Sequence, residues 1–236
     1  MASATVKRGK KVSSNVFPVR VVFHLDGSGV CYDRRSPIHL DSLLNYLLVP
    51  YKSSVPGGGL NRSDPIDEFG LPLKPCGEKP FRFWAASALM PIGEVVETSS
   101  FWQKKFNERD ADFCNGVPNT ENATYRNRLK SFPVFLIREM EAFAMVPSIT
   151  KISILKRFKY LGKKHHEGYG RVIGVDIEPC DKNYSVVRGG IAMRWIPHAS
   201  GTHFLRPRPP YWSLQDRTQC IAPGEPVPQE IIDLYS

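Results

Sequence analysis

The sequence lacks the features of a secreted or membrane-spanning protein. It contains no run of about 18 consecutive apolar residues, the length that a transmembrane helix needs. Its first 15 residues carry Lys7, Arg8, Lys10 and Lys11, but no apolar segment like that of a secretory signal. We therefore expect a soluble, cytoplasmic protein with no membrane partner.

Signs of metal or redox chemistry are also missing. The five cysteines are widely scattered and form no C-x-x-C pair, so we expect reduced thiols. His165 and His166 are adjacent, which makes their rings diverge, and His198 and His203 have no nearby set of cysteines or carboxylates. We predict no metal site and no cofactor.

The composition nevertheless supports a folded core rich in strands. Hydrophobic residues make up 42% of the 236 residues and aromatic residues 11%, which excludes disorder of the whole chain. Twenty prolines and eighteen glycines disfavour a helical bundle and favour strands joined by many turns.

Positive charge is concentrated in two blocks. The chain has 32 Lys and Arg against 23 Asp and Glu, a net charge of +9. Residues 1–20 carry five basic groups and no acid, and residues 151–217 carry thirteen against five, whereas residues 21–150 carry fourteen against fifteen. Two basic blocks beside a neutral middle indicate a footprint for a polyanion, and nucleic acid is the favoured one.

The hydrophobic pattern predicts a mixed α+β fold. We expect strands over residues 16–25, 81–90, 95–106, 132–146, 171–178 and 185–196, and helices over 40–48 and 149–161, the second with Ser148 as N-cap. Long loops are predicted at 52–80 and 110–131. The order fits a ferredoxin-like β-α-β-β-α-β core over residues 16–221, with insertions at 52–80 and 102–131, a basic tail at 1–15 and a C-terminal tail at 222–236.

The segment over residues 156–178 carries the strongest chemical signal. Gly162, Gly168 and Gly170 allow close approach of the backbone and predict an anion-binding nest. Around it lie the cationic candidates Lys163, Lys164, His165, His166 and Arg171, and Tyr169 offers a ring for base stacking. A Rossmann or Walker loop is disfavoured because this loop follows a helix and opens a strand. The remaining alternative is a helix C-cap at Gly162 followed by a solvated basic hairpin.

Three further groups are candidate RNA contacts. Arg206, Arg208, Tyr211 and Trp212 alternate cations with rings and prolines, which suits either an RNA path, a subunit contact or a segment folded back onto the core. Arg126, Arg128 and Lys130 end the polar 110–131 stretch, and Arg34 and Arg35 lie just before the first predicted helix.

Three blocks resemble a known family. The run GKKHHEGYGRV at residues 162–172 resembles the glycine-rich loop after the last helix of RAMP-superfamily CRISPR proteins, which are built from ferredoxin-like, RRM-type domains. The block HLDGSGVCYDRRSPIHLDSLLNYLL at 24–48 and PRPPYW at 207–212 are similar to the type IV CRISPR-Cas subunit of the Cas-five class. The similarity spans most of residues 16–215 and leaves 52–80 and 110–131 unaligned.

The resemblance implies a non-catalytic subunit that caps the 5′ handle of the crRNA in a DNA-targeting type IV effector ribonucleoprotein of antiviral defence. Its partners would be the crRNA, the backbone and large subunits of that complex, and target DNA near the PAM-proximal end. Residues 162–164 and 168–171 would contact the handle, and Trp102 to Lys130 would form a thumb reaching over the guide to the first backbone subunit.

Two alternatives stay open at this point. The first is a metal-independent crRNA endoribonuclease using His39 as acid–base group, with Tyr32 or Lys52 as its partner. The favoured interpretation of His39 is that it caps or packs beneath the helix that follows it. The second is a generic RRM-like RNA-binding protein, which the lack of an RNP1-like aromatic pattern disfavours.

Overall fold

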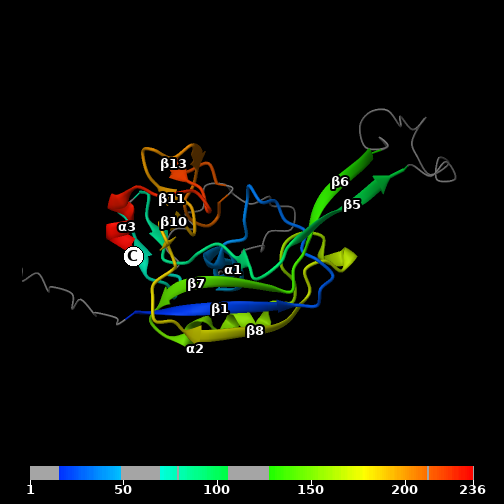
Figure 1. The fold of residues 1–236 in the computed structure, drawn as a ribbon, viewed down its shortest axis with the longest axis horizontal. Coiled ribbons are helices and arrows are strands. Elements are labelled where there is room, and N and C mark those ends of the chain that lie inside the picture. Colours follow the sequence, from blue (N-terminus) through cyan, green and yellow to red (C-terminus); the bar gives the residue numbers. More distant parts are fainter. Residues whose placement is uncertain (1–15, 49–69, 79, 106–127, 212, 236) are drawn as a thin grey trace, which may run out of the picture.

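A computed structural model describes residues 16–48, 70–78, 80–105, 128–211 and 213–235, and within them the chain is an α+β fold of mostly antiparallel strands (Figure 1). The central elements are β1 (Phe17–Leu25), α1 (Leu40–Leu48), β4 (Met90–Pro91), β7 (Glu139–Val146), α2 (Ile149–Ile152) and β8 (Val172–Pro179). The four strands form one sheet in the order β4-β7-β1-β8, so the first and last long strands lie side by side.

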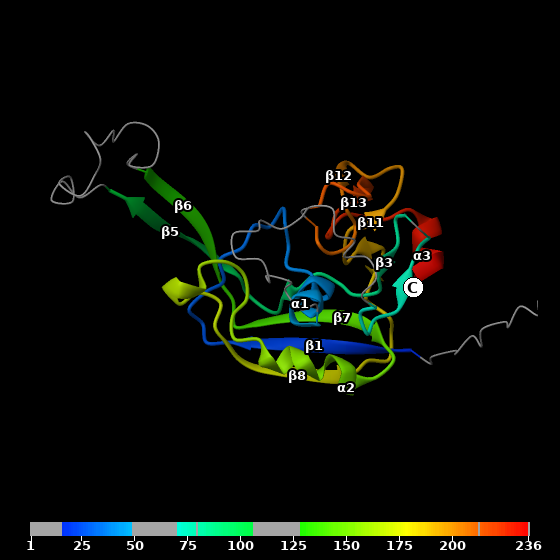
Figure 2. The same ribbon diagram turned by 180° about the vertical axis from the view of Figure 1, so that it is seen from behind.

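Strand β1 organises this sheet. It pairs antiparallel with β7 from Phe17↔Val146 to His24↔Glu139 and, on its other side, with β8. Its alternate residues Val19, Val21, Phe23 and Leu25 are buried in the main hydrophobic core with Leu40 and Leu44 of α1. The helices α1 and α2 therefore cover one face of the sheet, as Figure 2 shows, and leave the other face without a helix.

The helices are short. Helix α1 matches its predicted range, but the helix predicted over 149–161 ends at Ile152 and continues only as the 3-10 turn η4 (Ser153–Arg157). Ser148 makes no side-chain cap, while the Ser153 hydroxyl donates to the carbonyl of Thr150 at 2.7 Å and so competes with the helical ladder. None of the helices in the described ranges is long and apolar enough to cross a membrane.

A two-stranded ribbon projects from the sheet (Figure 1). Strands β5 (Val96–Lys104) and β6 (Arg128–Leu136) pair in unbroken register from Val96↔Leu136 to Lys104↔Arg128, and we call this pair the ribbon. The strand predicted over 132–146 is thus two strands, because β6 runs back along the ribbon to its base and the chain then enters the sheet as β7. Residues 128–131, predicted as loop, are part of β6, and residues 110–127 of that loop lie outside the described residues.

A smaller unit with its own core follows. It contains β2 (Pro75–Cys76), β3 (Phe83–Trp84), β9 (Val187–Arg188), β10 (Ile191–Ala192), β11 (Ile196–Pro197), β12 (His203–Leu205), β13 (Thr218–Ile221) and α3 (Gln229–Tyr235). The strands predicted over 81–90 and 185–196 are short pieces here, the latter turning at Gly189 and Gly190 with positive φ. Val227 and Ile231 are buried in this core, so residues 222–235, predicted as a tail, belong to the folded unit.

Candidate nucleic-acid interface

The glycine-rich loop, residues 162–171, packs tightly against the turn that follows β1. The amide of Lys163 donates to the carbonyl of Cys31, and the amide of Gly170 to that of Gly29, both at 2.7 Å. A Cβ on Gly162 would lie 2.5 Å from the Cys31 carbonyl oxygen, and one on Gly170 would lie 1.9 Å from that of Leu161. These two glycines have positive φ and are needed because backbone passes directly over backbone.

This packing corrects the predicted anion nest. The amides of Lys163, Gly168 and Gly170 all donate to carbonyls of the protein itself and are not available to a phosphate. The alternative of a helix C-cap at Gly162 is also wrong, because η4 ends at Arg157. An anion at this loop would therefore meet the loop's cationic side chains and not these three amides.

The loop presents most of its cationic side chains to solvent. Lys163, His165, His166 and Arg171 are exposed, and Tyr169 is half-buried. His165 is held in place, since its Nε2 lies 2.7 Å from the Gly162 carbonyl oxygen and its ring stacks on Tyr160. His166, in the short 3-10 turn η5 (His165–Glu167), and Lys163, which precedes that turn, are thus exposed on the outside of the loop.

Lys164 joins the loop to the ribbon. Its backbone is left-handed, with φ of 64°, and its ammonium lies 2.5 Å from Oε1 of Glu167. The same ammonium lies 4.5 Å from the centre of the Phe132 ring and 5.5 Å from that of Trp102, both on the ribbon. The sequence predicted Lys164 as a cation of the loop but did not predict these two rings as its neighbours.

Trp102, Arg128, Lys130 and Phe132 share the ribbon face that Lys164 approaches, and we call this the ring-and-cation face. Trp102 pairs directly with Lys130, and directly paired residues lie on the same face, as do alternate residues along β6. Arg128 and Lys130 are exposed, and Trp102 retains 37% of its accessible surface. Arg126, the third member of the predicted basic cluster, lies outside the described residues.

The opposite face of the ribbon is apolar toward its tip and polar at its base. Phe101 and Leu129 are exposed there. At the base, the Arg34 guanidinium lies 3.4 Å from the Glu97 carboxylate and 4.7 Å over the Phe135 ring, while Arg35 is exposed. The structure therefore brings Arg34 to the ribbon, but to the face away from Lys164.

The alternating stretch of Arg206, Arg208 and Tyr211 is not a surface. The Arg206 side chain is buried, and Arg208 keeps 12% of its side chain exposed and bonds to Asp216 at 2.7 Å and to the Arg82 carbonyl. Tyr211 donates its hydroxyl to Asp41 at 2.9 Å. RNA contact by these three residues is therefore disfavoured, because Arg206 is buried and carboxylates of the protein accept hydrogen bonds from Arg208 and Tyr211. Trp212 lies outside the described residues.

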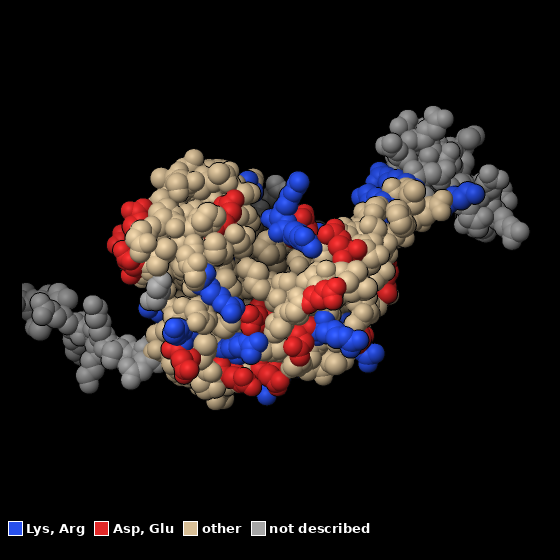
Figure 3. All heavy atoms as spheres, viewed as in Figure 1, with Lys and Arg blue, Asp and Glu red and all other residues tan. Residues whose placement is uncertain are grey.

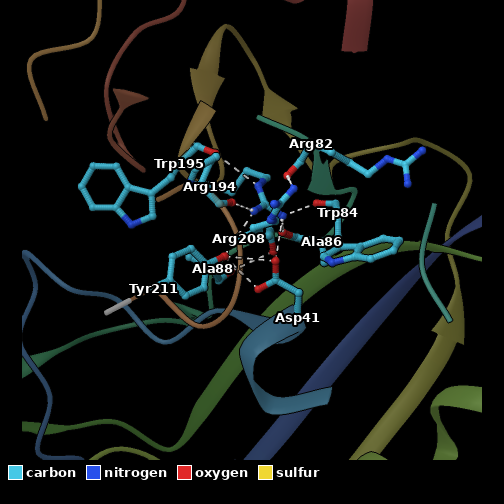
Figure 4. A network of polar contacts seen from close by, with 11 residues as sticks. Asp41, Arg82, Trp84, Ala86, Ala88, Arg194, Trp195, Arg208 and Tyr211 are labelled. Carbon is cyan, nitrogen blue, oxygen red and sulfur yellow. Dashed lines mark hydrogen bonds and ion pairs between the residues drawn. The ribbon is translucent and has the colours of Figure 1, made fainter. Parts of the chain in front are cut away.

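The centre of that buried network is an ion pair that the sequence did not reveal (Figure 4). Arg194 and Asp41 are both fully buried and lie 3.2 Å apart. Arg194 also donates to the carbonyls of Trp84, Ala86 and Pro207. Burial raises the pKa of Asp41, while Arg194 lowers it. The network fastens α1 to the smaller unit and to the 206–211 stretch.

His39 is also buried and is not placed as a catalytic group. It is 2% exposed, its ring stacks on Tyr211 with centroids 4.6 Å apart, and neither ring nitrogen has a hydrogen-bond partner among the described residues. Burial, and then Arg194, holds its pKa well below 6.5, so the ring is neutral. Of its predicted partners, Tyr32 is buried against Phe135 and Lys52 lies outside the described residues.

The sheet face without helices is unsuited to a polyanion. Arg20 and Arg188 both bond to Glu141, and His24 bonds to Glu139 at 2.9 Å and to Asp176 at 2.8 Å. Figure 3 looks onto this face and shows acidic and basic side chains intermixed across it. Because these basic side chains already form ion pairs with carboxylates of the protein, RNA binding by the sheet surface, as in a generic RRM, is disfavoured.

Comparison with protein-family models and curated proteins adds no constraint to this geometry. No protein-family model matches the chain, and no curated protein matches it. Across the described ranges, no three His, Cys, Asp or Glu side chains are grouped so that they could hold a metal ion.

Proposed function

We propose that the protein binds single-stranded RNA along the ring-and-cation face of the ribbon and the adjoining glycine-rich loop. The observation that carries this proposal is the meeting of Lys164 with Trp102 and Phe132, which lines up cations and rings from two distant segments. Rings with exposed faces stack on unpaired bases, and neighbouring cations attract the phosphates between them.

The topology supports a ferredoxin-like core as the scaffold of this interface. Along the chain the elements run β1, α1, β4, β7, α2 and β8, and in the sheet the strands lie in the order β4-β7-β1-β8. This is the order in which a β-α-β-β-α-β core places its first and third strands at the centre. The ribbon is then an insertion between the second and third strands of that core, with the character of a thumb.

The resemblance to type IV CRISPR-Cas subunits of the Cas-five class gives this RNA an identity. We propose that it is a crRNA whose 5′ handle lies against the loop, in a complex with the backbone and large subunits that targets DNA. The protein itself serves as a non-catalytic RNA-binding subunit. The thumb extends over residues 96–136 in this proposal, wider than the 102–130 expected from the sequence, because β5 and β6 pair throughout.

The salt dependence of RNA binding tests the interface. Replacing Arg128 and Lys130 together by alanine removes two phosphate contacts, so the slope of log affinity against log salt should become shallower by about 1.4, at about 0.7 per phosphate. The control is Lys151→Ala with Lys182→Ala, two exposed cations at the opposite end of the sheet with the same loss of charge. Equal slopes for the two double variants would exclude the ribbon from the RNA path.

The identity of the RNA needs a separate experiment. The protein expressed with its CRISPR array should co-purify with a discrete small RNA, and sequencing of its 5′ end should return a repeat-derived handle. Incubation with labelled repeat RNA should leave that RNA uncut. Site-specific cleavage that disappears in His39→Ala would replace the non-catalytic proposal by the endoribonuclease.

A further inference from the structure

One acidic side chain stands inside the proposed RNA interface. Glu167 is the only carboxylate of the loop over residues 162–171, and all its near partners are cationic or can become so. Its Oε1 lies 2.5 Å from the Lys164 ammonium and 3.3 Å from Nε2 of His166. The hydrogen bond from Lys164 lowers the pKa of Glu167, so this carboxylate is ionised at neutral pH.

The position of Lys164 is closely defined. It is a non-glycine residue in the left-handed region, an uncommon backbone conformation, and its side chain is only 17% exposed. Three groups surround its ammonium, namely the rings of Trp102 and Phe132 and the Glu167 carboxylate. The rings provide a neutral wall, and the carboxylate provides the single full negative charge among these three groups.

A carboxylate in this place has the chemistry of a phosphate oxygen. Both are anionic acceptors of charge-assisted hydrogen bonds from an ammonium. Beside it, Trp102 is partly exposed and pairs across the ribbon with Lys130, so a base stacked on Trp102 would have a cation on each side. The arrangement is that of a binding site for one nucleotide in which the Glu167 carboxylate already occupies the position of the phosphate.

We propose that the junction of the glycine-rich loop and the ribbon is a subsite for one nucleotide of single-stranded RNA, in which Glu167 holds the phosphate position until RNA displaces it. This inference rests on the proposed function and specifies how its interface is occupied without RNA. The base stacks on Trp102, and its phosphate replaces Glu167 at the Lys164 ammonium. Glu167 thereby weakens RNA binding to the wild-type protein.

The consequence is that removing a charge from Glu167 strengthens binding in a particular way. In Glu167→Gln the Lys164 ammonium is no longer neutralised, so binding releases one more counterion. The salt slope should steepen by about 0.7, which makes the gain in affinity about 2.6-fold larger at 50 mM salt than at 200 mM. The matched control is Glu178→Gln on β8, which removes one exposed negative charge at the end of β8 away from the loop and should leave the slope unchanged.

The experiment is fluorescence anisotropy of a mixed-sequence single-stranded RNA carrying a 3′ fluorophore, with thermal melts to establish that each variant is folded. A second variant, Lys164→Gln in the Glu167→Gln protein, should cancel the gain. Two forms of the RNA, with a 5′-hydroxyl and with a 5′-phosphate, separate the two sources of phosphate. An equal gain for both means that the subsite takes an internal phosphodiester, whereas a gain for the 5′-phosphate RNA alone means that it takes the terminal group.

An unchanged slope in Glu167→Gln, or the same gain in Glu178→Gln, would overturn the subsite and leave Glu167 as a structural partner of Lys164. Failure of the proposed function gives a different result. In that case the folded wild-type protein either does not bind single-stranded RNA, or binds it with a slope that the Arg128 and Lys130 substitutions do not alter.

Discussion

Two segments of this protein combine cations and aromatic rings, and the fold uses them in opposite ways. In the 206–211 stretch, Arg208 and Tyr211 turn inward, where Asp216 and Asp41 accept their hydrogen bonds. On the ring-and-cation face of the ribbon, Arg128 and Lys130 are exposed beside Trp102. The composition of the two segments is alike, and what differs is that carboxylates meet the 206–211 stretch, namely the buried Asp41 of α1 and the partly exposed Asp216.

The largest effect is expected where the inward segment meets the buried ion pair. Arg194→Met should lower the free energy of unfolding by about 3–5 kcal/mol, because it leaves Asp41 buried without its counter-charge. Urea denaturation measures this. Arg188→Met is the matched control, since Arg188 of β9 also pairs with a carboxylate, Glu141 of the sheet, but its side chain is 49% exposed. Equal losses of unfolding free energy in the two variants would show that the buried cation contributes no more to stability than the exposed one.

A smaller effect is expected from the outward segment, and on a different measurement. Trp102→Ala should weaken single-stranded RNA binding by about 1–3 kcal/mol, roughly 5- to 150-fold, through the loss of base stacking. The stability of the Trp102→Ala protein should change little because the Trp102 ring is partly exposed in the wild type. Tyr211→Phe should do the reverse, lowering stability through the lost bond to Asp41 while RNA affinity stays the same. RNA binding that depends on Tyr211 and not on Trp102 would mean that the 206–211 stretch, and not the ribbon, contacts RNA.

The smallest effect concerns the cations of the open sheet face. The hydrogen bond to Asp176, aided by that to Glu139, raises the pKa of His24 above 6.5 in the folded protein. Stabilisation from His24 is therefore fully present below about pH 6.5, the pKa of the unfolded chain, and is lost as pH rises through the folded value. Melting temperatures from pH 5.5 to 8.5 should fall more for the wild type than for His24→Gln. Parallel profiles would mean that these bonds contribute no net stability.

Sequence patterns predicted the elements whose identity depends on local periodicity. Strand β1, helix α1 and strand β8 matched their predicted ranges closely, because each shows a regular spacing of apolar residues along one face. The helix over 149–161 failed since its spacing is compatible with a 3-10 turn as well. Residues 128–131 are mostly polar and show no apolar alternation of their own, and they form a strand because β5 pairs with them.

The candidate site was less predictable because its contacts are long-range. Tyr211 and Asp41 are 170 positions apart, and no local feature near residue 211 reveals that a carboxylate will meet it. Lys164 likewise meets Trp102 and Phe132 only after the loop and the ribbon have folded. The glycine-rich loop was located correctly, but its glycines serve close backbone packing, and an inspection of composition does not separate that use from a phosphate nest.

The connection between β6 and β7 gives the ribbon a mechanical property. Only two residues separate Leu136 from Glu139, and the first of them, Ile137, is buried in the main core. At the same point the backbone of Phe135 bonds in both directions to Val30. Through β6, the ribbon is therefore joined directly to β7, an inner strand of the sheet. A force applied to β6 is therefore transmitted to β7 and to the hydrogen bonds between β7 and β1.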